Sequence, residues 1–153
     1  MENKVETRIT KVGTGIFVMN DKNQVLFQKR TGSHGSNTWC IPGGHLEWQE
    51  SFLENAIRET KEETDLDVED VEIVGVTNDI FKEENKHYIT IFMKATKWSG
   101  EPRITEPDRS LEMGWFDLDK LPQPLFVSDE NFFKLNPPCL CGSGKNWQDC
   151  HAK

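Results

Sequence analysis

The sequence predicts a mixed α/β domain in which a β-sheet is packed between helices. β-prone runs at residues 15–19, 25–29, 71–81 and 87–96 are interspersed with helical patterns. Strands and helices intermixed in this way are typical of a sheet covered by helices. The length of 153 residues suits one domain of ordinary size, and 35% hydrophobic with 29% charged residues is typical of a soluble globular protein.

The strand-like runs are expected to form two antiparallel pairs. The turn-forming residues 20–23, with sequence NDKN, separate the first two runs and predict a hairpin. A charged turn at residues 82–86 joins the second pair. Trp115 and Phe116 predict a further short strand, and residues 128–135 predict a closing helix capped by Ser128.

The longest helix is predicted to begin at Ser51. Ser51 and Glu54 form a capping-box pattern, which fixes the start of a helix. One stripe of the helical wheel is expected to face the core. It consists of Phe52, Leu53, Ala56, Ile57, Thr60 and Thr64.

The same helix carries three glutamates, Glu59, Glu62 and Glu63, on adjoining faces. Packing does not favour three carboxylates that repel one another, whereas a hard divalent cation takes oxygen ligands of this kind. The pair Gly43-Gly44 precedes the helix, and together these features predict a site for a metal bound to phosphate. Taken alone, a run of alternating charges is more often a solvated helix face with ion pairs.

The wider spacing favours the metal site over the solvated face, because it resembles the Nudix box of the Nudix hydrolases. The positions that match the family motif are Gly44, Glu50, Arg58, Glu59, Glu62, Glu63 and Leu66. Two positions depart from it. Thr60 replaces the usual aliphatic residue, and Asp65 replaces the glycine that normally ends the helix. Asp tolerates the left-handed conformation required there.

The resemblance extends over roughly residues 7 to 135, including the segments 30–35, 42–47, 106–108 and 114–117. In these segments the sequence is similar to small Nudix enzymes that act on nucleoside or pterin triphosphates. The resemblance implies an α/β/α sandwich with a mixed sheet, assigned to residues 1–135. It also implies hydrolysis of a diphosphate linkage in a nucleoside triphosphate or related nucleotide, which gives a monophosphate and pyrophosphate.

The resemblance implies roles for the acidic residues. Mg²⁺ or Mn²⁺ is expected to be held by Glu59 and Glu63, with Glu62 and the carbonyl of Gly43 nearby. Glu63 is the first choice for the catalytic base, and Glu59 is the second.

Two further residues, Glu50 and Arg58, are expected to orient the catalytic helix through an ion pair. Four residues are expected to contact the substrate: Arg30, His45, Trp115 and Glu106. For Arg30 and His45 the alternative to substrate contact is an ordinary surface charge, and for Trp115 it is packing in the core.

The C-terminal segment, residues 136–153, has the composition of a separate metal-binding tail. Cys139, Cys141, Cys150 and His151 lie within thirteen residues, and four N and S ligands suit a tetrahedral zinc ion. The one-residue gap between the first two cysteines is tighter than usual. The segment resembles the SEC-C motif, a small zinc-binding module, in its residues 139–145, Trp147 and the final Cys-His pair. A redox-active or disordered tail is the alternative.

Charge and hydropathy limit the partners of the chain. A formal net charge of −8 disfavours binding to a nucleic-acid backbone, and no apolar run approaches the ~20 residues that span a membrane. The N-terminal residues lack the apolar core of a signal peptide, which predicts a cytoplasmic protein.

Several alternatives stay open at this point. The domain could sense a nucleotide without cleaving it while the tail docks a protein partner, or it could cleave a nucleotide sugar or a dinucleotide. The sequence also leaves a homodimer open.

Overall fold

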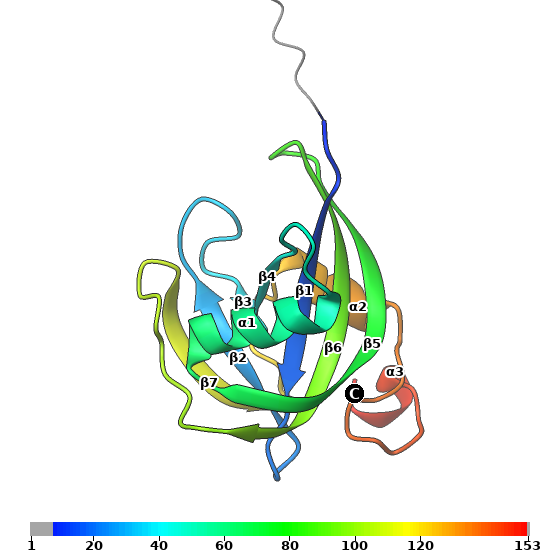
Figure 1. Cartoon of the computed structure of the whole chain (residues 1–153). Coiled ribbons are helices and arrows are strands. Elements are labelled where there is room, and N and C mark those ends of the chain that lie inside the picture. The colour runs from blue at the N-terminus through cyan, green and yellow to red at the C-terminus, as the bar shows by residue number, and fades with distance from the viewer. Residues whose placement is uncertain (1–7, 153) are drawn as a thin grey trace, which may run out of the picture.

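The computed structural model describes residues 8–152 and contains two β-sheets with helices packed against them (Figure 1). The strands are β1 (Lys11–Val18), β2 (Gln24–Arg30), β3 (Trp39–Cys40), β4 (Gly43–His45), β5 (Asp67–Phe81), β6 (Lys86–Ser99) and β7 (Ser110–Asp117). The helices are α1 (Phe52–Thr64), α2 (Val127–Lys134) and α3 (Trp147–Cys150). No helix within residues 8–152 is long and apolar enough to cross a membrane.

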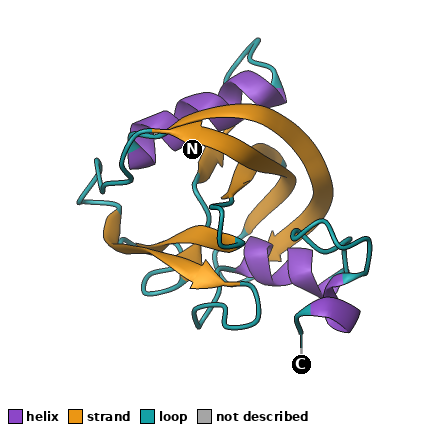
Figure 2. Cartoon of the chain, turned by 90° about the horizontal axis from the view of Figure 1, so that it is seen from below, coloured by secondary structure: helices purple, strands orange, loops and turns teal. Residues whose placement is uncertain are grey.

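The larger sheet is mixed and has the strand order β4-β1-β6-β5, whereas the smaller sheet, β3-β2-β7, is antiparallel. Within the larger sheet β1 and β6 run parallel, and the other pairs are antiparallel. The long helix lies on one side of the strands and the two C-terminal helices on the other (Figure 2). The predicted mixed sheet between helices is therefore confirmed.

The predicted hairpin between the first two strands forms only at its turn. The chain turns at residues 20–23 and an antiparallel bridge joins Met19 to Val25, but β1 and β2 themselves do not pair within residues 8–152. Both edges of β1 are already occupied, by β4 and by β6, so β2 leaves and joins the other sheet. The second predicted pair, β5 with β6, is confirmed; β5 begins four residues earlier than predicted, and β6 is longer at both ends.

Helix α1 begins and ends as predicted. Ser51 and Glu54 form both bonds of the capping box, and Asp65 has a left-handed conformation with φ of 61°. The predicted core stripe is only partly correct, because Phe52, Leu53 and Ile57 are exposed.

The face of α1 that is buried includes polar side chains. It consists of Asn55, Ala56, Glu59, Thr60 and Thr64. Asn55 is fully buried and accepts a hydrogen bond from the Thr14 hydroxyl on β1. Its amide nitrogen donates to the His45 carbonyl and to Glu50. These bonds turn the polar face of the helix toward β1 and β4, which leaves part of the apolar stripe in solvent.

Helix α2 begins at Val127, with Phe126 in the N-cap position and no side-chain cap. The predicted capping role of Ser128 is therefore wrong, because its hydroxyl donates to Asp129 inside the first turn. Phe132 and Phe133 on α2 pack against the larger sheet. Their rings lie next to the ring of Phe17 on β1, with centroids 4.8 and 5.8 Å away.

The C-terminal tail shares a hydrophobic core with α2. Trp147 is 7% exposed, and its ring centroid lies 4.5 Å from that of Phe133. Cys139 and Leu140 belong to the same buried cluster, and the Leu140 carbonyl accepts a hydrogen bond from Lys94 on β6. Helix α2 is thus held between the larger sheet and the tail.

Candidate active site

A cleft with a volume of about 720 Å³ opens between the two sheets. Strands β1, β4 and β6 line one side, and β2 with the segment around Glu106 lines another. Helix α1 contributes Arg58, Glu59, Glu62 and Glu63 to this cleft. The structure therefore brings Glu59, Glu62 and Glu63 to a single concave surface.

The two glycines of β4 are required by close approach. A Cβ atom on Gly43 would overlap the Thr14 carbonyl oxygen, since β4 pairs with β1 at this point. A Cβ atom on Gly44 would overlap the carboxylate of Glu59. Glycine at both positions lets the backbone of β4 lie directly against β1 and against the acidic face of α1.

Replacing Gly44 with alanine is expected to displace the Glu59 side chain, because the new methyl group would occupy the position of its carboxylate. A carboxylate can rotate away at little cost to folding, so divalent-metal affinity should fall while the melting temperature changes little. Titration with Mn²⁺ followed by calorimetry measures the first quantity, and thermal unfolding measures the second. Unchanged metal affinity would contradict a role for Glu59 in metal binding.

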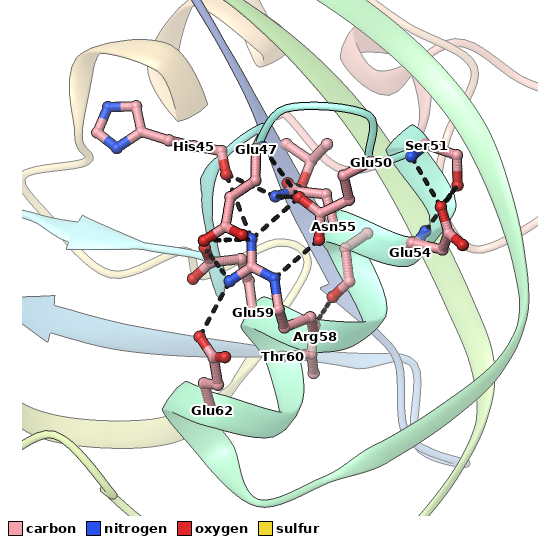
Figure 3. Close-up of polar contacts among 12 residues, drawn as sticks. His45, Glu47, Glu50, Ser51, Glu54, Asn55, Arg58, Glu59, Thr60 and Glu62 are labelled. Carbon is pink, nitrogen blue, oxygen red and sulfur yellow. Dashed lines mark hydrogen bonds and ion pairs between the residues drawn. The ribbon is translucent and has the colours of Figure 1, made fainter.

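Arg58 forms the centre of an ion-pair network (Figure 3). Its guanidinium donates to both oxygens of Glu50, at 2.8 and 3.1 Å, and to Glu59 at 2.9 Å and Glu62 at 3.1 Å. The bond from Arg58 lowers the pKa of Glu50 to about 2. The loop before α1 is thereby fixed to the helix, and the ion pair between Glu50 and Arg58 is present in the structure.

The carboxylates of Glu59 and Glu63 are held in surroundings that disfavour their charge. Glu63 accepts hydrogen bonds from the Gln28 amide at 2.7 Å and from the Gly43 backbone N–H at 3.0 Å. Burial nevertheless raises the pKa of Glu63 to about 7 and also raises that of Glu59, and Glu106 adds to both shifts. A cation in the cleft would favour the ionised forms, so this donor set fits a hard divalent metal.

The three glutamates share the cleft without forming a closed cluster. Glu62 is half exposed and bonds to Arg58, whereas Glu63 is held by β2 and β4. Within residues 8–152, only the tail brings three or more candidate ligand atoms within 4.8 Å of one another. Mutual repulsion and separate hydrogen-bond donors keep the carboxylates of α1 further apart.

Three of the four predicted substrate contacts line the cleft, namely Arg30, His45 and Glu106. Trp115 does not. Its ring stacks on Trp98, with centroids 5.3 Å apart, and packs against the buried cluster beneath α1. The side chain of Trp115 on β7 thus faces the core. The structure therefore shows packing, and not base stacking, as the role of Trp115.

Sequence reasoning missed three polar residues in or next to the cleft: Gln28, Asn55 and Asp129. Asn55 gave a signal, since asparagine favours caps and turns over positions inside a helix. Gln28 gave no signal, because it follows the apolar run 25–27 and precedes Lys29 and Arg30, where a further polar residue is unremarkable. Asp129 gave no signal, because an acid in the first turn of a helix is ordinarily explained by the helix dipole.

Asp129 gives the protein a predicted dependence of stability on pH. The carboxyl group is 2% exposed, and burial raises its pKa from 3.8 to about 7. Between these values the folded protein binds a proton that the unfolded chain has lost, so the free energy of unfolding should fall as pH rises from about 4 to about 7. Urea unfolding of the metal-free protein at several pH values measures this slope, which Asp129→Asn should reduce.

The tail forms a second candidate metal centre. The ligand atoms of Cys139, Cys141, Cys150 and His151 all lie within 4.8 Å of one another. The Cys139 sulfur lies 3.0 Å from His151 Nδ1, and the sulfurs of Cys141 and Cys150 are 3.7 Å apart. All three cysteines are free thiols, so the cluster is not a disulfide. Three sulfurs and one imidazole at such distances fit a tetrahedral metal ion.

The chain matches two family models, the NUDIX domain over residues 9–135 and the SEC-C motif over residues 136–153. A MutT NUDIX hydrolase from Burkholderia pseudomallei has a similar crystal structure, with a TM-score of 0.74 and 35% sequence identity. The match covers 76% of this chain and 90% of that one.

Two curated relatives are named for different activities. A nucleoside triphosphate pyrophosphatase/Nudix hydrolase fusion protein from Bifidobacterium longum is 34% identical over 102 residues, which are 64% of this chain and 20% of the fusion protein. An ADP-ribose pyrophosphatase from Methanocaldococcus jannaschii is 29% identical over 109 residues, 71% of this chain and 63% of that protein. The chain thus spans less than two thirds of the length of either relative.

Proposed function

This chain belongs to the Nudix hydrolase family, and on that premise we propose that it hydrolyses a diphosphate linkage in a nucleoside triphosphate or related nucleotide. The products are a nucleoside monophosphate and pyrophosphate. The observation that carries the proposal is the position of Glu63, a carboxylate of raised pKa that lines the cleft beside Glu59 and is held by two hydrogen-bond donors.

The residues that would hold Mg²⁺ or Mn²⁺ are Glu59 and Glu63, with Glu62 and the Gly43 carbonyl nearby. Such a cation, when bound, neutralises phosphate charge and acidifies a water molecule for in-line attack on phosphorus. Glu63 would accept the proton of such a water, because its carboxylate lines the cleft beside Glu59 and is held there by two hydrogen-bond donors. The bonds from Gln28 and from the Gly43 N–H keep its carboxylate aligned.

The remaining cleft residues position the reacting groups. Arg58 and Glu50 orient α1, so they act on the reaction through Glu59. Arg30 and His45 contribute hydrogen-bond donors to a cleft in a chain whose formal net charge is −8. Glu106 adds a further carboxylate from the loop that faces α1. Local attraction by the cation and by Arg30 then offsets the repulsion between an acidic protein and its polyphosphate substrate.

A screen of nucleotides tests this proposal. Common and damaged nucleoside triphosphates, together with ADP-ribose and nucleotide sugars, are incubated with the protein and magnesium, and product masses are determined. We expect metal-dependent formation of monophosphate and pyrophosphate from at least one triphosphate. Cleavage of ADP-ribose alone would favour the alternative substrate class, for which the archaeal relative provides the precedent. Saturable binding without turnover would favour a sensor.

The tail is proposed to hold a structural zinc ion through Cys139, Cys141, Cys150 and His151. The four side chains offer only N and S ligands and leave no open position for a substrate. Trp147 packs against Phe133 from within the same segment. The zinc ion would therefore stabilise the surface of α2 rather than take part in hydrolysis.

A further inference from the structure

Gln28 is a buried glutamine that bonds to Glu63 from the other sheet. It is 6% exposed on β2, in the smaller sheet, whereas Glu63 lies on α1, which packs on strands of the larger sheet. The Gln28 amide donates to Glu63 Oε2 at 2.7 Å. The backbone N–H of Gly43 on β4 donates to the same oxygen at 3.0 Å. Both donors therefore bind one of the two carboxylate oxygens.

The two donors leave the oxygens of Glu63 in different states. A carboxylate oxygen has about two acceptor positions, so Gln28 and Gly43 together fill those of Oε2. No donor within residues 8–152 bonds to Oε1. Every buried side-chain nitrogen or oxygen in that part of the chain has a hydrogen-bond partner. Because Oε1 has none, it is accessible in the cleft that Glu63 lines.

A stabilising role alone does not require this arrangement. The bond from Gln28 does tie β2 to α1, and hence the smaller sheet to the larger one. Such a tie could be formed through either oxygen of Glu63, and the two donors could be divided between them. Here both donors converge on Oε2, which leaves Oε1 as the oxygen that can bind a cation without losing a hydrogen bond.

The number of oxygens that a carboxylate offers distinguishes magnesium from calcium. Mg²⁺ requires nearly ideal octahedral geometry with bonds of about 2.0–2.1 Å, which suits a single oxygen from each carboxylate. Ca²⁺ takes about 6–8 oxygen ligands at about 2.3–2.6 Å and can bind both oxygens of one carboxylate. A glutamate restricted to one free oxygen therefore disfavours Ca²⁺ more than Mg²⁺.

We propose that Gln28 makes the metal site selective for Mg²⁺ over Ca²⁺, because it occupies Glu63 Oε2 and limits this glutamate to one ligand oxygen. The Gly43 N–H alone would leave one acceptor position on Oε2 free. The inference rests on the proposed function, whose metal site includes Glu63. It makes Gln28 a positioning residue that acts on the metal through Glu63.

The test compares the dissociation constants of Mg²⁺ and Ca²⁺ in the wild type and in Gln28→Met. Each ion displaces bound Mn²⁺, and EPR of the released Mn²⁺ gives both constants without nucleotide or turnover. Methionine is an unbranched side chain without an N–H donor, so it frees one position on Oε2. We expect the affinity for Ca²⁺ relative to Mg²⁺ to rise by about tenfold, the change that one hydrogen bond to a charged group provides.

Gln24→Met is the matched control. Gln24 is a second glutamine on β2, and it donates to the carboxylate of Asp117 at 2.9 Å, outside the cleft. The control should keep the wild-type ratio of the two constants, because loss of a merely stabilising bond does not change the choice between ions. An unchanged ratio in folded Gln28→Met, or an equal shift in Gln24→Met, would overturn the inference.

The wild type decides the matter if Gln28→Met does not fold. A crystal structure with Mn²⁺, located by its anomalous signal, should show the ion on Glu63 Oε1, with Oε2 still bonded to Gln28 and Gly43. An ion bound by Oε2, or by both oxygens of Glu63, would contradict the role of Gln28.

The two proposals can fail separately. Metal-dependent hydrolysis together with an unchanged ratio in folded Gln28→Met would overturn the role of Gln28 and leave the proposed function intact. Selectivity for Mg²⁺ that Gln28→Met reduces, without hydrolysis of any nucleotide, would support the role of Gln28 and overturn the proposed function. A wild type that binds neither ion would overturn both.

Discussion

Replacing Glu63 with glutamine is expected to lower kcat by about 10²–10⁴, the range attributed to general-base catalysis. The substitution removes the group that accepts the proton and also one charge from the proposed metal site. The glutamine side chain has nearly the same volume, and its amide oxygen can accept the bonds from Gln28 and from the Gly43 N–H. The fold should therefore be retained.

The measurement is magnesium-dependent release of pyrophosphate from the best substrate, made together with thermal unfolding. Glu69→Gln serves as the control, because Glu69 is an exposed glutamate on β5, outside the cleft. We expect the control to match the wild type in both assays. Turnover in Glu63→Gln within a few fold of the wild type would show that the base lies elsewhere.

Removal of the proposed zinc ion is expected to destabilise the tail and then α2. Only Cys139, Leu140 and Trp147 of the segment 139–151 are buried, so we expect the segment to depend on metal for its conformation. Loss of Trp147 from its position on Phe133 is comparable to a large-to-small core substitution, which costs about 3–5 kcal/mol. For a chain of this length the melting temperature should fall by about 6–20 °C.

Zinc content by native mass spectrometry and hydrogen exchange after chelation measure this effect. Protection should decrease in the tail and in α2 but remain in β1 and β6. Because α2 also carries Asp129 and Phe126 into the cleft, we expect KM to rise more than kcat falls. Cys150→Ser should reproduce the result without a chelator. A protein that contains no zinc as purified and does not respond to chelation would contradict the assignment of the tail.

The fold was predictable where one local signal determined one element. The capping box fixed the start of α1 at Ser51, and the left-handed Asp65 fixed its end. The separation of β1 and β2 into two sheets was not predictable from the turn between them, because β1 pairs with β6, whose residues lie 77 positions away. The rotation of α1 likewise depends on Asn55, whose partner Thr14 lies on a distant strand.

The candidate site was predictable only as far as the motif extends. Spacing along one helix placed Glu59, Glu62 and Glu63 in one cleft, but it gave no account of Gln28, which approaches Glu63 from β2. The sequence left both core packing and base stacking open for Trp115, because the position of an aromatic residue on a strand does not tell which face is buried. Asp129 could be identified only from the structure, because its burial results from the packing of α2 against the segment around Ile41.

The most direct test of the central claim is a crystal structure with magnesium and a non-hydrolysable triphosphate analogue. We predict a cation bound by the carboxylates of Glu59 and Glu63 and by phosphate oxygens. The account would be contradicted if Glu63 stays bonded to Gln28 and Glu59 to Arg58 while the cation and the phosphates bind elsewhere.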